Sequence, residues 1–223
     1  KRKLIVTDTV FSMDGDIAPM PEIVELAKKF DAMVMMDEAH ATGVLGKSGR
    51  GAVELFDLKG RLEVQMGTFS KAFGGFGAFV CGSKELIEFL INTARSFIYT
   101  TALPPSVLAA NITSIELVKN EPELRKRLWE NMEYFKRGLL SYKFDILESR
   151  TPIIPILLGD NELTMNFSKM LLEEGIFIQG IRPPTVPKGS ARLRITVIAT
   201  HTREDLDKAL EAIVKVAKKL GIK

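Results

Sequence analysis

"PEIVELAKKFDAMVMMD" (residues 21–37) predicts a helix that runs directly into a buried strand. Pro21 suits a first helical turn, and the strand ends at Asp37. The apolar residues of the first half recur at helical spacing: Ile23, Leu26, Ala27 and Phe30. Residues 4–7 (LIVT), upstream, are another apolar run and predict a buried parallel strand. A strand, a helix and a strand with short connections form a βαβ unit, so the two strands are parallel.

The rest of the chain alternates strands and helices in the same way, which makes the fold class α/β. We expect further strands at 62–67, 77–82, 97–101, 153–158, 176–179 and 192–198, and helices at 83–96, 105–119, 121–141, 161–174 and 202–220. Residues 1–120 are predicted to form one domain and residues 121–223 a second, smaller α/β domain. In open parallel sheets ligands bind at the carboxyl ends of the strands, where Asp37 lies.

The composition argues against several classes of protein. The 31 basic residues against 28 acidic ones give a charge of +3, too mild for nucleic-acid binding by bulk electrostatics. A single cysteine, Cys81, rules out an intrachain disulfide framework and fits a reducing compartment. No apolar run approaches the ~20 residues of a membrane span, and no signal-peptide pattern opens the chain. We therefore expect a cytoplasmic protein that binds neither nucleic acid nor membrane.

Two motifs point to other functions. "ATGVLGKS" (41–48) has Ala41 where a phosphate-binding P-loop needs its first glycine, and no helix follows at once. "DEAH" (37–40) places His40 three residues after Asp37, a pair that suits a metal site, a catalytic pair or a helicase box. No further ligand spacing supports a metal, and no true P-loop supports a helicase. The structural alternative is that Asp37 caps the following turn and His40 joins a polar network.

"TFSKAFGGFGAF" (68–79) places Lys71 among hydroxyl-bearing, small and aromatic residues. A lone lysine is ordinarily a solvated charge, but burial among such neighbours disfavours the ammonium form and lowers the lysine pKa. A neutral amine is a nucleophile that forms a Schiff base with an aldehyde, and the hydroxyls and glycines suit a phosphate group. With Asp37 facing a ring nitrogen, these groups suggest a site for pyridoxal 5'-phosphate (PLP).

Five stretches together resemble the α-oxoamine synthases, fold-type I PLP enzymes that condense an amino acid with an acyl-CoA and release carbon dioxide. They are "VFSMDGDIAPMPEI" (10–23), "MMDEAHATGVLGKSGRG" (35–51), "MGTFSKAFGGFGAFV" (66–80), "TTALPPSV" (100–107) and "IRPPTVPKGSARLRIT" (181–196). The resemblance implies that residues 1–120 are the C-terminal part of a large PLP-binding domain with a mainly parallel sheet, and that residues 121–223 are the small C-terminal domain. Family members carry a long section before the first stretch, so we expect the N-terminal part to be absent here.

The resemblance also implies roles for individual residues. Lys71 is implied to be the lysine that forms the imine with PLP, Asp37 the carboxylate paired with the pyridine nitrogen, and His40 the histidine beside the phenolic oxygen. These three are the implied catalytic residues, and no metal is expected. Further contacts with the cofactor are implied for Ser12, Thr68, Thr100 and Thr101.

In this family the stretch of Thr100 and Thr101 reaches the phosphate of the neighbouring subunit, which implies a homodimer with shared sites. Arg194 is implied to bind the carboxylate of the amino acid, and a guanidinium suits that role because its fork meets a carboxylate with two hydrogen bonds. Arg192 lies two positions away on the same predicted strand and therefore faces the same side.

The loop "IRPPTVP" (181–187) resembles the family member that joins L-alanine to pimeloyl-CoA in biotin synthesis. Arg182 then meets the distal carboxylate of the pimeloyl chain, or it is an exposed loop arginine. Three other functions stay open at this point. They are the member that joins glycine to acetyl-CoA, a non-catalytic piece that serves in assembly, and nucleotide binding through residues 41–48.

Overall fold

The structure, a computed structural model, describes residues 1–222 and divides into two compact units. The first unit contains Lys1–Phe11 and Ile17–Pro122. The second contains Ser12–Asp16 and the chain from Glu123 onward. The short segment Ser12–Asp16 therefore belongs by its contacts to the second unit, although both of its flanks belong to the first.

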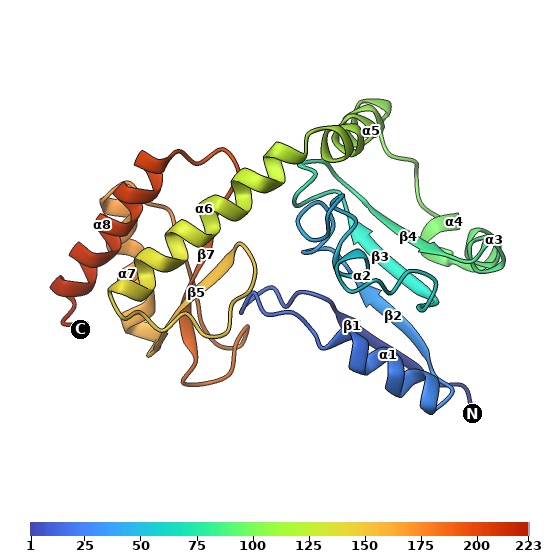
Figure 1. Cartoon of the computed structure of the whole chain (residues 1–223), viewed down its shortest axis with the longest axis horizontal. Helices are drawn as coiled ribbons and strands as arrows, with labels where there is room; N and C mark the ends of the chain where they lie inside the picture. The colour runs from blue at the N-terminus through green and yellow to red at the C-terminus, as the bar shows by residue number, and fades with distance from the viewer. Residues whose placement is uncertain (223) are drawn as a thin grey trace. The chain divides into compact units, whose positions relative to one another are not determined.

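The first unit is built on a four-stranded sheet in the order β1-β2-β3-β4 (Figure 1). β1 (Leu4–Asp8), β2 (Met33–Asp37) and β3 (Val64–Thr68) are parallel, whereas β4 (Ala78–Gly82) runs antiparallel to β3. The prediction of a mainly parallel sheet is confirmed. Because the strands are in register, the carboxyl ends of β1, β2 and β3 meet at one edge of the sheet.

The helices of the first unit are α1 (Met20–Lys29), α2 (Ala52–Leu55), α3 (Lys84–Thr93), α4 (Arg95–Ile98) and α5 (Pro105–Asn120). The predicted cap of α3 is confirmed, because the Ser83 side chain accepts a hydrogen bond from the Leu86 backbone N–H at 3.2 Å. The predicted strand 97–101 is wrong. Its first residues belong to α4, where the N–H groups of Phe97 and Ile98 both donate to the Ala94 carbonyl at 2.9 Å.

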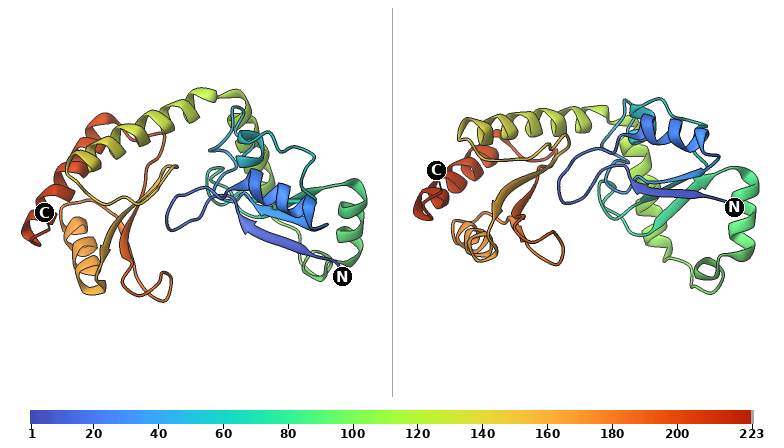
Figure 2. Two further views of the ribbon diagram at one scale, coloured as in Figure 1. Left: turned by 60° about the horizontal axis from the view of Figure 1, so that its bottom comes forward. Right: turned by 90° about the horizontal axis from the view of Figure 1, so that it is seen from below.

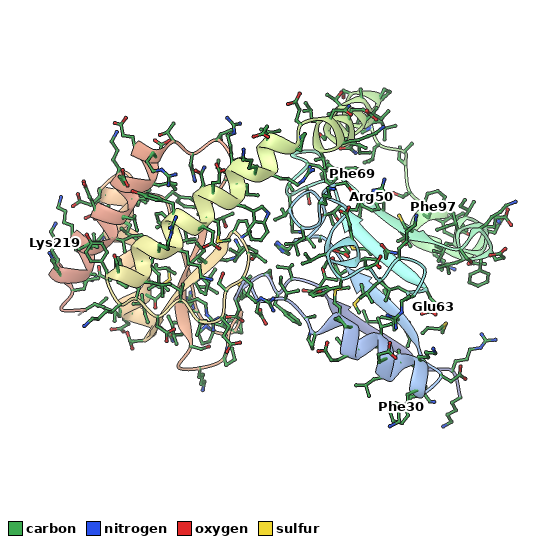
Figure 3. The ribbon with its side chains drawn as sticks, viewed as in Figure 1. Phe30, Arg50, Glu63, Phe69, Phe97 and Lys219 are labelled. Carbon is green, nitrogen blue, oxygen red and sulfur yellow. The ribbon has the colours of Figure 1, made fainter. Side chains whose placement is uncertain are left out.

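α1 confirms the predicted helix, but of the four apolar residues that marked its spacing only Ala27 is buried. Leu26 and Phe30 are exposed, and Figure 3 shows Phe30 projecting from the end of the helix. The buried stripe consists instead of Met20, Val24 and Ala27, which lie one helical turn apart. The spacing of apolar residues alone does not determine which of two neighbouring apolar stripes on a helix is buried.

β1 was expected to be buried, but it is an edge strand with one uncovered face. Leu4 is 52% and Val6 60% exposed, and Val80 of the opposite edge strand is exposed as well. In this chain the apolar runs of β1 and β4 therefore have less cover than parallel strands ordinarily have.

The second unit has an antiparallel sheet in the order β5-β7-β6, formed by β5 (Ile153–Gly159), β6 (Gln179–Ile181) and β7 (Ala191–Thr196). The helices α6 (Pro122–Ser141), α7 (Asn161–Glu173) and α8 (Arg203–Lys219) gather on one face of it (Figure 2). The core between them is apolar and includes Phe135, Leu139, Ile154, Phe167, Leu193 and Ile213. α8 opens with the predicted cap, since Thr202 and Asp205 bond each other's backbone N–H groups.

The strand predicted at 176–179 is displaced, because pairing with β7 begins only at Gln179. Ile176, Phe177 and Ile178 instead line a cavity of about 540 Å³ against α8. No helix within residues 1–222 combines the length and apolar character that crossing a membrane requires.

Candidate active site

Two carboxylates lie side by side where β1 and β2 end. Asp8 and Asp37 are direct partners in the parallel register of these strands. Asp37 is fixed by its surroundings, because its Oδ1 accepts the Ala39 backbone N–H at 2.8 Å. Its carbonyl accepts both the N–H and the hydroxyl of Thr9, at 2.9 and 3.0 Å. The predicted position of Asp37 at a strand end is confirmed, and the contact with Ala39 is the turn cap that the structural alternative described.

Asp8 was missed by the sequence analysis. Burial raises the pKa of the Asp8 carboxyl, the negative charge of Asp37 raises it further, and the positive charge of Lys71 lowers it. These effects place both Asp37 and Lys71 within electrostatic reach of Asp8. The signal for Asp8 was its position, because it ends a predicted parallel strand as Asp37 does.

Lys71 lies in the loop that connects β3 to β4. The loop is closed by the N–H of Phe69, which donates to the Gly77 carbonyl at 2.9 Å, and by the N–H of Gly75, which donates to the Phe69 carbonyl at 2.7 Å. The Lys71 Nζ donates to the Thr68 hydroxyl at 3.4 Å. Thr68 is the last residue of β3, so the predicted pair of lysine and phosphate-binding hydroxyl meets at the same edge as Asp8 and Asp37.

The expected burial of Lys71 is wrong for this chain, because its side chain is exposed. The phenylalanines pack on one another instead of over the amine. The ring of Phe69, labelled in Figure 3, lies 5.5 Å from that of Phe73 and 5.2 Å from that of Phe79. Phe76 is 62% exposed. The amine of Lys71 is consequently accessible to a reactant from solvent.

The loop after β2 packs directly against the lysine loop. Gly43 has φ +85°, and a Cβ on it would come within 2.8 Å of the Ala72 Cβ. Only glycine fits this backbone conformation and this close approach. The contact brings the loop that carries the half-buried His40 next to the loop that carries Lys71.

The buried Glu38 anchors the end of the loop of residues 41–51. This residue is 3% exposed, and its carboxylate accepts the N–H groups of Ala52 and Val53 at 2.8 Å each, together with the Thr9 hydroxyl at 3.2 Å. Burial raises the pKa of Glu38, and the hydrogen bonds offset this only in part. Sequence reasoning missed this role because the partners are 14 or more positions away.

The P-loop alternative for residues 41–48 is wrong. The N–H groups of Ser48 and Arg50 donate to the Glu54 carboxylate at 3.1 and 3.0 Å, so a carboxylate occupies the donors that a phosphate would need. The helix that follows, α2, has only four residues. Across residues 1–222 no cluster of three or more metal-ligating side chains is found, so DEAH makes no metal site within them.

α5 supports the lysine loop through two of its side chains. The buried Asn111 donates its amide to the Phe76 carbonyl at 2.9 Å and accepts the Phe76 N–H at 3.4 Å. Ser114, one turn further, donates to the Phe73 carbonyl at 2.7 Å. These two side chains satisfy backbone groups that no strand or helix uses, and they fix the segment that follows Lys71.

The other predicted residues lie elsewhere in the chain. Thr100 and Thr101 are exposed between α4 and α5. Ser12 and Arg194 meet in the second unit, where the Arg194 Nε donates to the Ser12 carbonyl. Burial lowers the pKa of the Arg194 guanidinium. Arg182 is exposed and follows β6.

Residues 1–213 match the model of the family described as aminotransferase class I and II. The chain belongs to this family. Its fold is that of a fold-type I PLP transferase, and the resemblance noted in the sequence is confirmed.

Curated relatives are similar over the entire chain. An 8-amino-7-oxononanoate synthase of Thermosipho melanesiensis is 54% identical over 222 residues, which are 100% of this chain and 57% of that protein. The 8-amino-7-oxononanoate synthase 1 of Bacillus subtilis is 51% identical over 100% of this chain and 57% of its own length. The chain therefore spans little more than half the length of these relatives.

Solved structures show the same likeness. A serine palmitoyltransferase of Sphingomonas wittichii superposes with a TM-score of 0.95 at 34% identity, over 99% of this chain and 56% of that one. A structure of SPT with PLP has a TM-score of 0.96 at 37% identity, covering 100% and 56%. The 8-amino-7-oxononanoate synthase of Francisella tularensis has a TM-score of 0.82 at 34% identity, covering 98% and 64%.

The residues at the strand ends fit PLP. Lys71 offers an accessible amine for the aldehyde, and Thr68 offers a hydroxyl for the phosphate. Burial raises the pKa of the Asp8 carboxyl and the negative charge of Asp37 raises it further, and a protonated ring nitrogen would relieve this repulsion between the two carboxylates. The chemistry of this set of side chains therefore matches the cofactor of the family.

We predict that the pKa of the Asp8 carboxyl shifts in opposite directions in two variants. Asp37→Asn removes a negative neighbour and lowers the pKa of Asp8, whereas Lys71→Ala removes a positive neighbour and raises it. Carbon-detected NMR titration of the aspartate carboxyls measures both changes. Lys59→Ala, an exposed lysine, is the control and leaves the pKa unchanged. If the pKa of Asp8 is the same in the native protein and in all three variants, Asp37 and Lys71 do not lie close to Asp8.

A second prediction concerns the support of the lysine loop. A Cβ on Gly75 would lie 2.1 Å from the Asn111 Oδ1, so Gly75→Ala destabilises the first unit by about 1–3 kcal/mol. In the Asn111→Ala background most of this cost disappears, because the clashing oxygen is gone. Urea unfolding of the four proteins of the cycle measures the coupling, and Thr113→Ala on the exposed face of α5 serves as control. If Gly75→Ala lowers the free energy of unfolding equally in the native and the Asn111→Ala proteins, Gly75 does not lie against the Asn111 side chain.

Proposed function

We propose that this chain is the part of an 8-amino-7-oxononanoate synthase that carries the PLP-binding lysine, and that the enzyme joins L-alanine to pimeloyl-CoA with loss of carbon dioxide. The observation that carries the chemistry is the cluster of Lys71, Asp37 and Asp8 at one edge of a parallel sheet. The choice of substrates rests on the named relatives, which are 51–54% identical over the chain. The serine palmitoyltransferase neighbours are less similar, at 34–37%.

When bound, PLP supplies an aldehyde for imine formation and an electron-withdrawing ring that stabilises negative charge on the substrate carbon. The Lys71 amine would bind the cofactor and would also serve as the general base that takes the α-proton of the substrate onto Nζ. The negative charge of Asp37 would favour a proton on the ring nitrogen, and Asp8, its register partner on β1, would add to the same field. His40, on the loop packed against Ala72, is assigned to the phenolic oxygen of the cofactor.

The remaining roles concern substrate binding and assembly. We assign the amino-acid carboxylate to Arg194 and the distal carboxylate of the acyl chain to Arg182. Residues 1–120 are assigned to the large domain and residues 121–223 to the small one. Thr100 and Thr101 are exposed hydroxyls, which supports a homodimer in which they reach the phosphate site of the partner. The free Cys81 fits a reducing cytoplasm.

The substrate assignment predicts which pair of reactants the enzyme that contains this chain uses. Release of CoA is expected with L-alanine and pimeloyl-CoA, and Lys71→Ala lowers the rate by at least ~10²-fold because the general base is lost. Colorimetric detection of the free thiol measures the rate. Arg50→Ala, an exposed residue outside the proposed site, retains the activity. Turnover only with glycine and acetyl-CoA, or only with serine and palmitoyl-CoA, contradicts the proposal.

A further inference from the structure

An ion pair with a buried arginine joins β7 to the segment Ser12–Asp16. The guanidinium of Arg192 is only 5% exposed and pairs with the carboxylate of Asp14. Its Nε also donates to the Ser190 carbonyl at 2.9 Å. Taking a guanidinium out of water is costly unless a counter-charge and hydrogen bonds compensate it, and Asp14 supplies the counter-charge. The pair therefore fixes Asp14 against the strand.

Arg194 holds the same segment two residues along the strand. Its Nε donates to the Ser12 carbonyl, and its Nη1 donates to the Thr196 hydroxyl at 3.3 Å. Residues two apart on a strand face the same side, so Arg192 and Arg194 contact the segment together. The bond to Ser12 sets the plane of the Arg194 guanidinium and leaves its terminal nitrogens with hydrogens for a carboxylate.

The middle of the segment is fixed by Gly15. Its carbonyl accepts the Arg150 N–H at 2.9 Å and the Thr151 hydroxyl at 3.0 Å. It has φ +70°, and a Cβ there would lie 2.0 Å from the Ile153 carbonyl oxygen. These contacts explain why the segment belongs to the second unit, although Phe11 and Ile17 on either side belong to the first.

We propose that the Arg192–Asp14 ion pair positions the amino-acid site: it holds the segment Ser12–Asp16 so that the Ser12 carbonyl orients Arg194 toward the substrate carboxylate. The inference rests on the proposed function, because it takes Arg194 as the residue that binds the amino acid. Arg192 is then a positioning residue, since it acts through Asp14 and Ser12 and not on the substrate.

An ion pair with one buried partner has a diagnostic response to substitution. Removing Asp14 leaves the Arg192 charge uncompensated in a place that excludes water, and removing Arg192 leaves the 40% exposed Asp14 carboxylate without its partner. Replacing both by apolar residues of similar size is often tolerated. Arg192→Leu and Asp14→Leu alone should therefore release the segment, and the double substitution should hold it again. A side chain that acts alone would not show this recovery.

The test compares the native enzyme with both single variants, the double variant and the control Lys169→Leu, an exposed residue on α7. Hydrogen exchange of the Arg150 amide, which donates to the Gly15 carbonyl, reports on the segment without substrate or cofactor. We expect exchange to be at least tenfold faster in each single variant and within threefold of native in the double variant. The KM for L-alanine is expected to rise about tenfold in each single variant and to recover in the double variant, while kcat stays within threefold.

Each contrary result has its own meaning. Faster exchange with an unchanged KM shows that the pair only stabilises the fold, and it overturns the positioning role. A double variant no better than the single variants, or single variants equal to native, also overturns it. A native enzyme that does not respond to alanine contradicts the proposed function and with it this inference, whereas a native KM that no variant alters contradicts this inference alone.

Discussion

The site depends on the parallel register of β1 and β2, which sets two carboxylates side by side. Asp8 and Asp37 are register partners, and their mutual repulsion contributes to the raised pKa of Asp8. Burial of Asp8 contributes most to the raised pKa, and the positive charge of Lys71, on the connection between β3 and β4, opposes it. Two carboxylates and one amine at this position suit the protonated ring nitrogen and the aldehyde of PLP.

Several side chains away from Asp8, Asp37 and Lys71 fix the conformation of the loops at the carboxyl ends of the strands. Glu38 holds the loop after β2 from inside the unit, and Gly43 lets that loop pack against Ala72. Asn111 and Ser114 hold the lysine loop from α5. The loops that carry His40 and Lys71 are therefore fixed by hydrogen bonds to the buried Glu38 and Asn111, while Lys71 itself is exposed.

The sequence was sufficient to predict what local pattern and motif spacing determine. The mainly parallel sheet, the position of Asp37, and the caps at Ser83 and Thr202 follow from apolar runs and turn residues, and the structure confirms them. The supports provided by Glu38 and Asn111 could not be predicted, because their partners are distant in sequence. The burial of Lys71 was predicted wrongly because the phenylalanines around it pack on one another. Likewise, the buried face of α1 was decided by tertiary contacts and not by apolar spacing.

The central claim is that Lys71 is the residue that binds PLP covalently. Borohydride converts the imine of a bound PLP into a stable secondary amine, so peptide mass spectrometry after reduction identifies the lysine that carried the cofactor. The account predicts a single modified peptide, with the pyridoxyl group on Lys71 and none in Lys71→Ala. Modification of a different lysine, or of none in protein that has been supplied with PLP, would contradict it.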